Sequence, residues 1–320
     1  MKGLQNWIIF STFVREKVNS DMTPQEAVEK LAQQDLKVTS ELEIRKLYEI
    51  ITDLPAIIAT IPLDLIITRV RPGRHMSLKD LTYPPVSVCK KMQRSSLAGE
   101  SAFYASLPDD QHHLENGRAL GLSETSTLAR QGKESLGREF LTVSQWVTKK
   151  PLRVISFMTD KTFVNTKNRS KHIKELTKYF AEQYHSLTDV QKEVIRIIDE
   201  DFCKVVKDGN VHEYKRTAIL AHDMIYDSEY NLDGIVYAPV QMEGQLGINV
   251  MLKPASVDEK LELYRVIHCS YYKNGEQSLM MIDKGYDNNG HLLSKIPLEE
   301  DIICQKIGIQ RIKDLPVVKH

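Results

Sequence analysis

The stretch "LIITRV", residues 65–70, marks the point where the pattern of the chain changes from helical to extended. It is short and rich in β-branched residues, which is typical of a strand. Side chains two positions apart lie on the same face of a strand, so Arg69 and Arg71 are expected to point to one side. Further strand candidates follow along the chain: "SAFYAS" from residue 101, "PLRVISFM" from 151, "DGIVYAPVQ" from 233, "INVMLKP" from 248 and "LYRVIHCSYY" from 263.

Helical signals stand before and between these strands. Two capping boxes, Thr23–Glu26 and Ser40–Glu43, precede apolar residues at helical spacing, so residues 1–60 are expected to be helical. Three amphipathic patterns near residues 171–184, 189–205 and 213–225 predict inserted helices. The sequence therefore predicts an α+β fold, with a mixed sheet, inserted helices and a small helical N-terminal region. The expected division is a helical region at 1–60, a main domain at 61–275 and a C-terminal extension at 276–320.

The composition limits which classes of protein and of partner are expected. The chain of 320 residues holds 43 basic and 43 acidic residues, and this zero balance argues against nucleic acid or an anionic membrane as a partner. Its four cysteines are widely spaced, so neither a disulfide framework nor a metal site is indicated. The N-terminus has no signal-peptide pattern, and the most apolar stretch, residues 54–70, is interrupted by two prolines and an aspartate. We expect a soluble, cytoplasmic protein.

The stretch "RSSLAGESAFYASL", residues 94–107, gives the first indication of chemistry. Arg94 opens a loop of small residues around Gly99, and Tyr104 begins the expected strand behind it. An arginine and an aromatic ring around a glycine loop can bind a phosphorylated, ring-bearing ligand. They can equally form a surface turn before a half-buried strand. The P-loop, GxGxxG and GxSxG motifs are absent from the sequence, so the common nucleotide and hydrolase signatures do not apply.

An ordered series of short motifs resembles the RES-domain family, which is named for its Arg, Glu and Ser residues. The series covers about residues 63–255, and its members keep the order that the family shows. The matching pieces are Thr68-Arg69-Val70-Arg71, Tyr83-Pro84-Pro85, Arg94 through Gly99 to Phe103-Tyr104, Ser123-Glu124-Thr125, Ser144-Gln145-Trp146, Asp233-Gly234-Ile235-Val236-Tyr237 and Asn249 through Leu252 to Pro254.

The resemblance implies a fold similar to that of ADP-ribosyltransferases. It also implies cleavage of the nicotinamide–ribose bond of NAD by hydrolysis or phosphorolysis, with NAD as substrate and no metal or further cofactor. Many members of the family are toxins of bacterial toxin–antitoxin pairs, so a small antitoxin protein is an expected partner. The implied catalytic residues are Glu124, which would stabilise an oxocarbenium-like ribose, and Arg69. The implied substrate-binding residues are Arg71, Arg94, Tyr104 and Tyr237, with arginines on the pyrophosphate and Tyr104 on the nicotinamide ring.

Two of the motifs depart from the family's pattern. Pro239 stands where the family has Ser, and proline offers neither a hydroxyl nor an amide hydrogen. Gln93 and Ser96 replace the usual Gly and Asn of the arginine loop. Two alternatives therefore stay open: a degenerate module that binds a nucleotide or a partner, and an ADP-ribosyltransferase that acts on a macromolecule. Glu124 also has a simpler interpretation, as an exposed carboxylate in the first turn of a helix capped by Ser123. The oligomeric state is left open.

Overall fold

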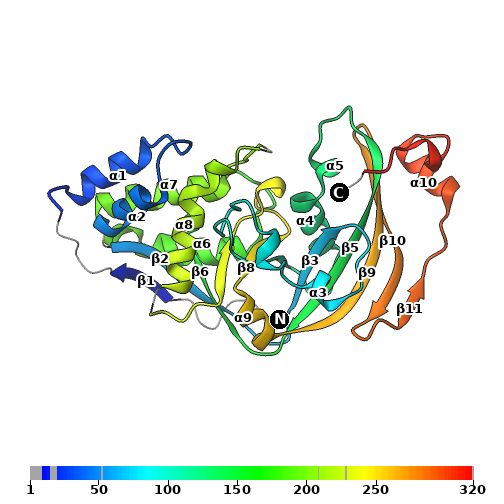
Figure 1. Cartoon of the computed structure of the whole chain (residues 1–320), viewed down its shortest axis with the longest axis horizontal. Coiled ribbons are helices and arrows are strands. Elements are labelled where there is room, and N and C mark those ends of the chain that lie inside the picture. The colour runs from blue at the N-terminus through cyan, green and yellow to red at the C-terminus, as the bar shows by residue number, and fades with distance from the viewer. Residues whose placement is uncertain (1–8, 15–19, 52, 208, 228, 319–320) are drawn as a thin grey trace.

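The strands of the protein form a large mixed sheet. The computed structural model describes residues 9–14, 20–51, 53–207, 209–227 and 229–318. Eleven strands lie in the order β1-β2-β6-β7-β8-β4-β3-β5-β9-β10-β11 (Figure 1). Their bounds are β1 Ile9–Val14, β2 Asp53–Ile61, β3 Ile66–Pro72, β4 Phe103–Pro108, β5 Leu136–Thr148, β6 Leu152–Ser156, β7 Gly234–Tyr237, β8 Gly247–Leu252, β9 Leu261–Asn274, β10 Gln277–Asp287 and β11 Leu292–Lys295. Among these described strands, β6 and β7 are parallel and the other pairs are antiparallel.

Helices cover one half of this sheet. Their bounds are α1 Pro24–Ala32, α2 Glu41–Ile50, α3 Leu78–Leu81, α4 Glu115–Thr125, α5 Thr127–Arg130, α6 Lys171–Gln183, α7 Asp189–Cys203, α8 Lys215–Tyr226, α9 Pro254–Lys260 and α10 Glu300–Ile307. Short 3₁₀ helices are η1 Val86–Val88, η2 Tyr184–Ser186, η3 Val211–Tyr214, η4 Val240–Met242 and η5 Ile312–Asp314. Figure 1 shows α1, α2, α6, α7 and α8 grouped beside β2 and β6, while β3, β5, β9 and β10 curve away on the other side.

A hydrophobic core joins the helices to the sheet. Leu31 of α1, Tyr48 of α2, Phe180 of α6, Ile198 of α7 and Ile219 of α8 are all buried in one cluster. The same cluster holds the apolar residues of β2, β6, β7 and β8. Burial of these amphipathic faces, which the capping and spacing patterns predict, is what stabilises the helices. The α+β class with a mixed sheet and inserted helices is confirmed.

The N-terminal region is less helical than the sequence suggested. The capping boxes of α1 and α2 form as expected, with Glu26 and Glu43 reaching back to the cap residues. The prediction of helix to residue 60 is wrong, because β2 occupies residues 53–61 and pairs with β1 and β6. A strand with neighbours on both sides and buried faces is apolar throughout, so its sequence lacks the alternation that marks a strand. The expectations for residues 1–8 and 15–19 lie outside the described residues.

Local turn signals later in the chain were reliable. The Asn274-Gly275 pair forms the tight turn between β9 and β10, with Gly275 at a φ of 63°.

All four cysteines are free thiols. None of the helices in the described part of the chain has the length and apolar character needed to cross a bilayer.

Helix α4 lies unusually close to β3 because two glycines face the strand. A Cβ atom on Gly117 would lie 2.6 Å from Oγ1 of Thr68, and one on Gly121 would lie 2.3 Å from Cγ2 of Val70. Gly117 and Gly121 are one helical turn apart, so they share the face of α4 that meets the sheet. Glu124, three residues beyond Gly121, lies on the same side of the helix. The two glycines therefore set how closely Glu124 approaches the strands.

Replacing Gly121 by alanine is expected to lower the free energy of unfolding by about 1 to 2 kcal/mol, because the added methyl overfills the contact with Val70. Chemical denaturation would measure the loss. The double variant Gly121→Ala/Val70→Ala removes the methyl groups that clash and should recover part of the stability. Equal stability of the single variant and the wild type would contradict the close contact.

Candidate functional site

A cavity of about 470 Å³ lies between α4, the Arg94 loop and the segment after α7. Its floor is a row of side chains across four neighbouring strands. Thr68 on β3 pairs with Ser106 on β4, Ser106 pairs with Asn249 on β8, and Asn249 pairs with Tyr237 on β7. All four residues line the cavity. Directly opposed residues point to the same face of a sheet, so the register of these strands builds the floor.

Glu124 projects into this cavity from the last turn of α4. The interpretation of Glu124 as a first-turn residue capped by Ser123 is therefore wrong: Ser126 is the cap residue, and it begins α5. The Glu124 carboxylate accepts a hydrogen bond from the Gln241 amide at 3.4 Å, and the side chain of Asn249 also bonds to it. Burial raises the pKa of Glu124, while the Arg94 charge and these two hydrogen bonds oppose the rise.

The side chain of Asn249 is oriented by Ser106 on the neighbouring strand. Its Oδ1 atom accepts a hydrogen bond from the Ser106 hydroxyl at 3.0 Å, which leaves the amide hydrogens of Asn249 to be donated. The Gln241 amide that reaches Glu124 belongs to η4, which begins after Pro239. The carboxylate of Glu124 is thus positioned by groups from two separate segments of the chain.

Arg94 lines the same cavity, but its side chain donates hydrogen bonds to the protein itself. Its side chain is only 8% exposed and reaches the end of α7, where it donates to the carbonyls of Asp201, Phe202 and Lys204 at 2.8 to 3.1 Å. A positive charge is favourable at a helix C-terminus, where carbonyls have no partner in the helix. The guanidinium also lies over the Tyr214 ring, 5.0 Å from its centroid. Arg94 therefore fixes one wall of the cavity.

Tyr104 and Tyr237 supply aromatic surface to the cavity. The Tyr104 hydroxyl bonds to the Ser95 amide at 3.2 Å and to the Ser96 hydroxyl at 2.9 Å, so it ties down the loop that follows Arg94. Tyr237 is almost fully buried, and burial raises its pKa well above the ordinary value. Both rings are un-ionised at neutral pH and present their faces rather than a charge.

Arg69 and Arg71 lie on the other face of β3. Thr68 and Val70 line the cavity, and side chains alternate along a strand, so the two arginines point away from it. Arg69 donates to the Tyr104 carbonyl at 2.6 Å and lies over the Phe103 ring, and burial followed by the Arg71 charge lowers its pKa to about 9. Arg71 donates to the carbonyl of Asp80. The structure therefore gathers Arg94, Tyr104, Glu124 and Tyr237 in one cavity and leaves Arg69 and Arg71 outside it.

Sequence reasoning assigned no role to several residues of the cavity, although Thr68 and Asn249 stand in the matched motifs. Thr68, Ser106 and Asn249 form most of its floor, and Lys91 and Arg130 add exposed positive charge at its wall. A small polar residue inside an otherwise apolar strand, such as Asn249 in "GINVML", was the available signal. That signal does not reveal which strands are neighbours, so it could not show that the three polar residues meet.

Comparisons with known proteins leave the family open. No protein-family model matches the sequence, and no curated protein matches it. Among solved structures, one chain of the crystal structure of the M. tuberculosis MbcT–MbcA toxin–antitoxin complex is similar to this chain. The TM-score is 0.30 and the identity 10%, over 65% of this chain and 86% of the other. A likeness this remote supports no inference about function, and the fold class rests on the strands and helices described above.

Proposed function

We propose that residues 61–275 form an NAD-cleaving domain of RES type and that the cavity around Glu124 is its active site. The observation that carries the proposal is the meeting of Arg94, Tyr104, Glu124 and Tyr237, four residues from separate motifs, in one cavity. A volume of about 470 Å³ lies within the usual range of small-molecule sites, about 300 to 1,000 Å³. The N-terminal region, which holds α1, α2 and most of β2, and the C-terminal extension flank this domain.

The proposed reaction breaks the bond between ribose C1 and the nicotinamide nitrogen. The nicotinamide leaves with the electron pair of that bond, and the ribose develops positive charge as in glycoside cleavage. The Glu124 carboxylate stabilises this charge, because it is held in place by Asn249 and the Gln241 amide before the reaction begins. Water or phosphate then adds to C1 and loses a proton.

The phosphates of NAD need positive charge at the cavity wall. Because Arg94 is engaged by the carbonyls at the end of α7, and Arg130 donates to the Glu124 carbonyl, we assign the pyrophosphate contact to the exposed side chain of Lys91. Arg94 then acts through its charge and by holding the wall. Arg69 acts as a positioning residue for β4 through its hydrogen bond to the Tyr104 carbonyl. A toxin-like role and a silencing partner protein belong to the same proposal, since unrestrained cleavage would deplete NAD.

A binding-only module is the second candidate. Two observations favour it: Pro239 occupies the position of the family's Ser, and three of the five N–H groups of Arg94 already donate within the protein. Transfer of ADP-ribose to a macromolecule is a third outcome, which labelling with a tagged NAD would reveal.

The deciding experiment incubates the purified protein with NAD, with and without phosphate, and follows nicotinamide by chromatography. Release of nicotinamide supports the enzyme, and dependence on phosphate identifies the acceptor. Absence of release together with heat stabilisation by NAD would favour the binding module. If the Pro239→Ser variant then releases nicotinamide, the missing hydroxyl explains why the natural protein does not cleave NAD.

The pH dependence of cleavage is expected to report Glu124. The active form is the carboxylate, so activity falls as pH drops through its pKa, and burial raises that pKa above the ordinary value of 4.5. The acid limb of kcat/KM, which reports the free enzyme, should therefore lie above pH 4.5. An acid limb at or below that value would contradict Glu124 as the essential group.

A further inference from the structure

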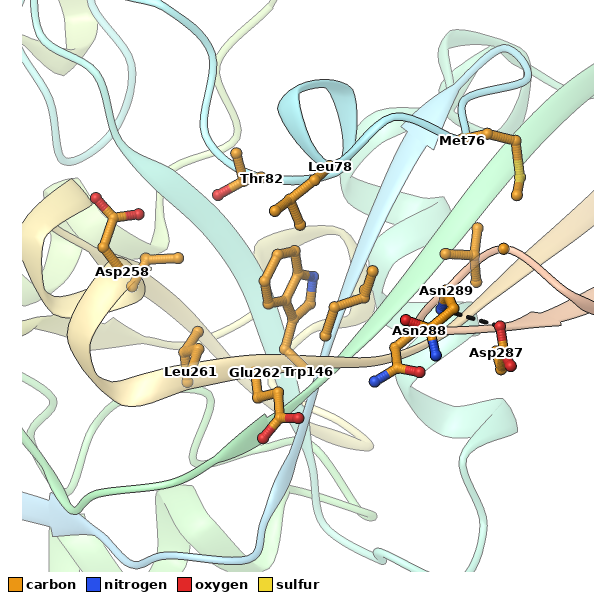
Figure 2. A pocket seen from close by; sticks show the side chains of 14 residues that line it. Met76, Leu78, Thr82, Trp146, Asp258, Leu261, Glu262, Asp287, Asn288 and Asn289 are labelled. Atoms are coloured by element: carbon orange, nitrogen blue, oxygen red, sulfur yellow. Dashed lines mark hydrogen bonds between the residues drawn. The ribbon is translucent and has the colours of Figure 1, made fainter.

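A second cavity, of about 480 Å³, lies on the opposite face of the sheet from the Glu124 cavity (Figure 2). Trp146 of β5 forms its centre and pairs with Ile67 of β3, whereas the neighbouring Thr68 faces the Glu124 cavity. The remaining walls come from α3, α9, β9 and the turn between β10 and β11. The two cavities are separated by the thickness of the sheet, so the second cavity needs an explanation of its own.

The middle of this cavity is apolar. The Trp146 side chain is only 4% exposed, and its indole N–H is already donated to the Ser144 hydroxyl at 3.0 Å. The Trp146 and Phe103 rings form a T-shaped contact at a centroid distance of 5.5 Å. Figure 2 shows Leu78 opposite the indole, and Leu78 is 59% exposed, which is high for a leucine. An apolar group between Trp146 and Leu78 would be covered on two sides.

The rim of the cavity is acidic. Asp258, Glu262 and Asp287 line it, and Lys, Arg and His are missing among the lining residues. Two of the carboxylates are satisfied within the protein. Glu262 pairs with Lys149 at 2.7 Å, and Asp287 accepts the amides of Asn289 and His291 at 2.9 and 2.8 Å.

Asp258 differs from the other two carboxylates. It accepts a hydrogen bond from the Tyr83 hydroxyl at 2.8 Å, and within the described ranges it forms no ion pair with a basic side chain. Figure 2 shows Asp258 at one end of the cavity and the asparagines of the turn at the other, with Trp146 between them. A carboxylate without a basic partner therefore lies at one end of a cavity whose middle is formed by the Trp146 ring.

We infer that this cavity binds an organic monocation with an apolar body, such as an arylalkylammonium ion or the side chain of a Lys or Arg residue in a peptide. The apolar body lies between Leu78 and the Trp146 ring, and the cationic head meets Asp258. Attraction of a cation to an indole face adds to the ion pair. The inference does not depend on NAD cleavage.

Calorimetric titration with phenethylammonium and with the neutral 2-phenylethanol tests the inference. The ammonium compound is expected to bind at least about tenfold more tightly, which corresponds to about 1.4 kcal/mol. Asp258→Asn should abolish that preference, because it removes the charge and keeps the shape. Glu262→Gln is the matched control: it removes a carboxylate that Lys149 already neutralises, and the preference should persist.

A parallel titration with a short peptide that carries one arginine between leucines separates the two sources of the cation. Tighter binding of the peptide than of the free amine assigns the site to a partner protein, and the reverse order assigns it to a small amine. Equal binding of phenethylammonium and 2-phenylethanol would overturn the inference. An unchanged preference in folded Asp258→Asn would overturn it as well.

Discussion

Replacing Glu124 by glutamine is expected to lower the rate of NAD cleavage by at least about a hundredfold, the scale of losing one electrostatic partner of a transition state. Glutamine keeps the size of the side chain and loses the charge that would face the oxocarbenium-like ribose. The rate of nicotinamide release at saturating NAD measures this effect. Because burial raises the pKa of Glu124, the fold favours the neutral side chain, and the variant should be no less stable than the wild type at neutral pH.

Glu115→Gln is the matched control for this experiment. Glu115 lies on the same helix, in its exposed first turn and outside the cavity, so the same chemical change there should leave the rate unchanged. Thermal unfolding of both variants separates a catalytic effect from a loss of structure. Wild-type rates in a folded Glu124→Gln variant would remove Glu124 from the mechanism.

Local signals predicted the elements whose structure is fixed locally. The boxes at Thr23 and Ser40 cap α1 and α2, and Asn274-Gly275 turns β9 into β10. The same reasoning predicted helix where β2 lies. It also treated Ser144-Gln145-Trp146 only as a motif, although these residues lie within the 13-residue strand β5. Both strands take their conformation from partners far along the chain, and neither shows a full alternation of polar and apolar residues.

The residues of the candidate site also fall into those that local sequence predicted and those that depend on long-range strand pairing. The motif series pointed to Arg94, Tyr104, Glu124 and Tyr237, and these four line one cavity. Strand periodicity correctly placed Arg69 and Arg71 on a common face, but periodicity alone does not say which face meets the cavity. The floor of Thr68, Ser106 and Asn249 follows from strand register. Register depends on long-range pairing, so the sequence of each strand could not give it.

The sequence did not predict the hydrogen bonds of Arg94 to the carbonyls at the end of α7, and these bonds lead to a second prediction. Arg94→Ala is expected to lower the free energy of unfolding by about 3 kcal/mol, because buried carbonyls at the end of α7 would lose their donor. Arg94→Lys should recover only part of this stability, since an ammonium cannot reproduce the planar fork that reaches three carbonyls. Urea denaturation measures both changes.

Lys91→Ala provides the comparison for Arg94, because Lys91 lines the same cavity with an exposed side chain. Its removal should change the free energy of unfolding by less than about 0.5 kcal/mol, as for most surface substitutions. The two variants thus separate a structural charge from a ligand-binding one: Arg94→Ala should weaken the fold, and Lys91→Ala should weaken the binding of NAD. If Arg94→Ala is as stable as the wild type and binds NAD less well, the guanidinium serves the ligand and leaves the α7 carbonyls when NAD binds.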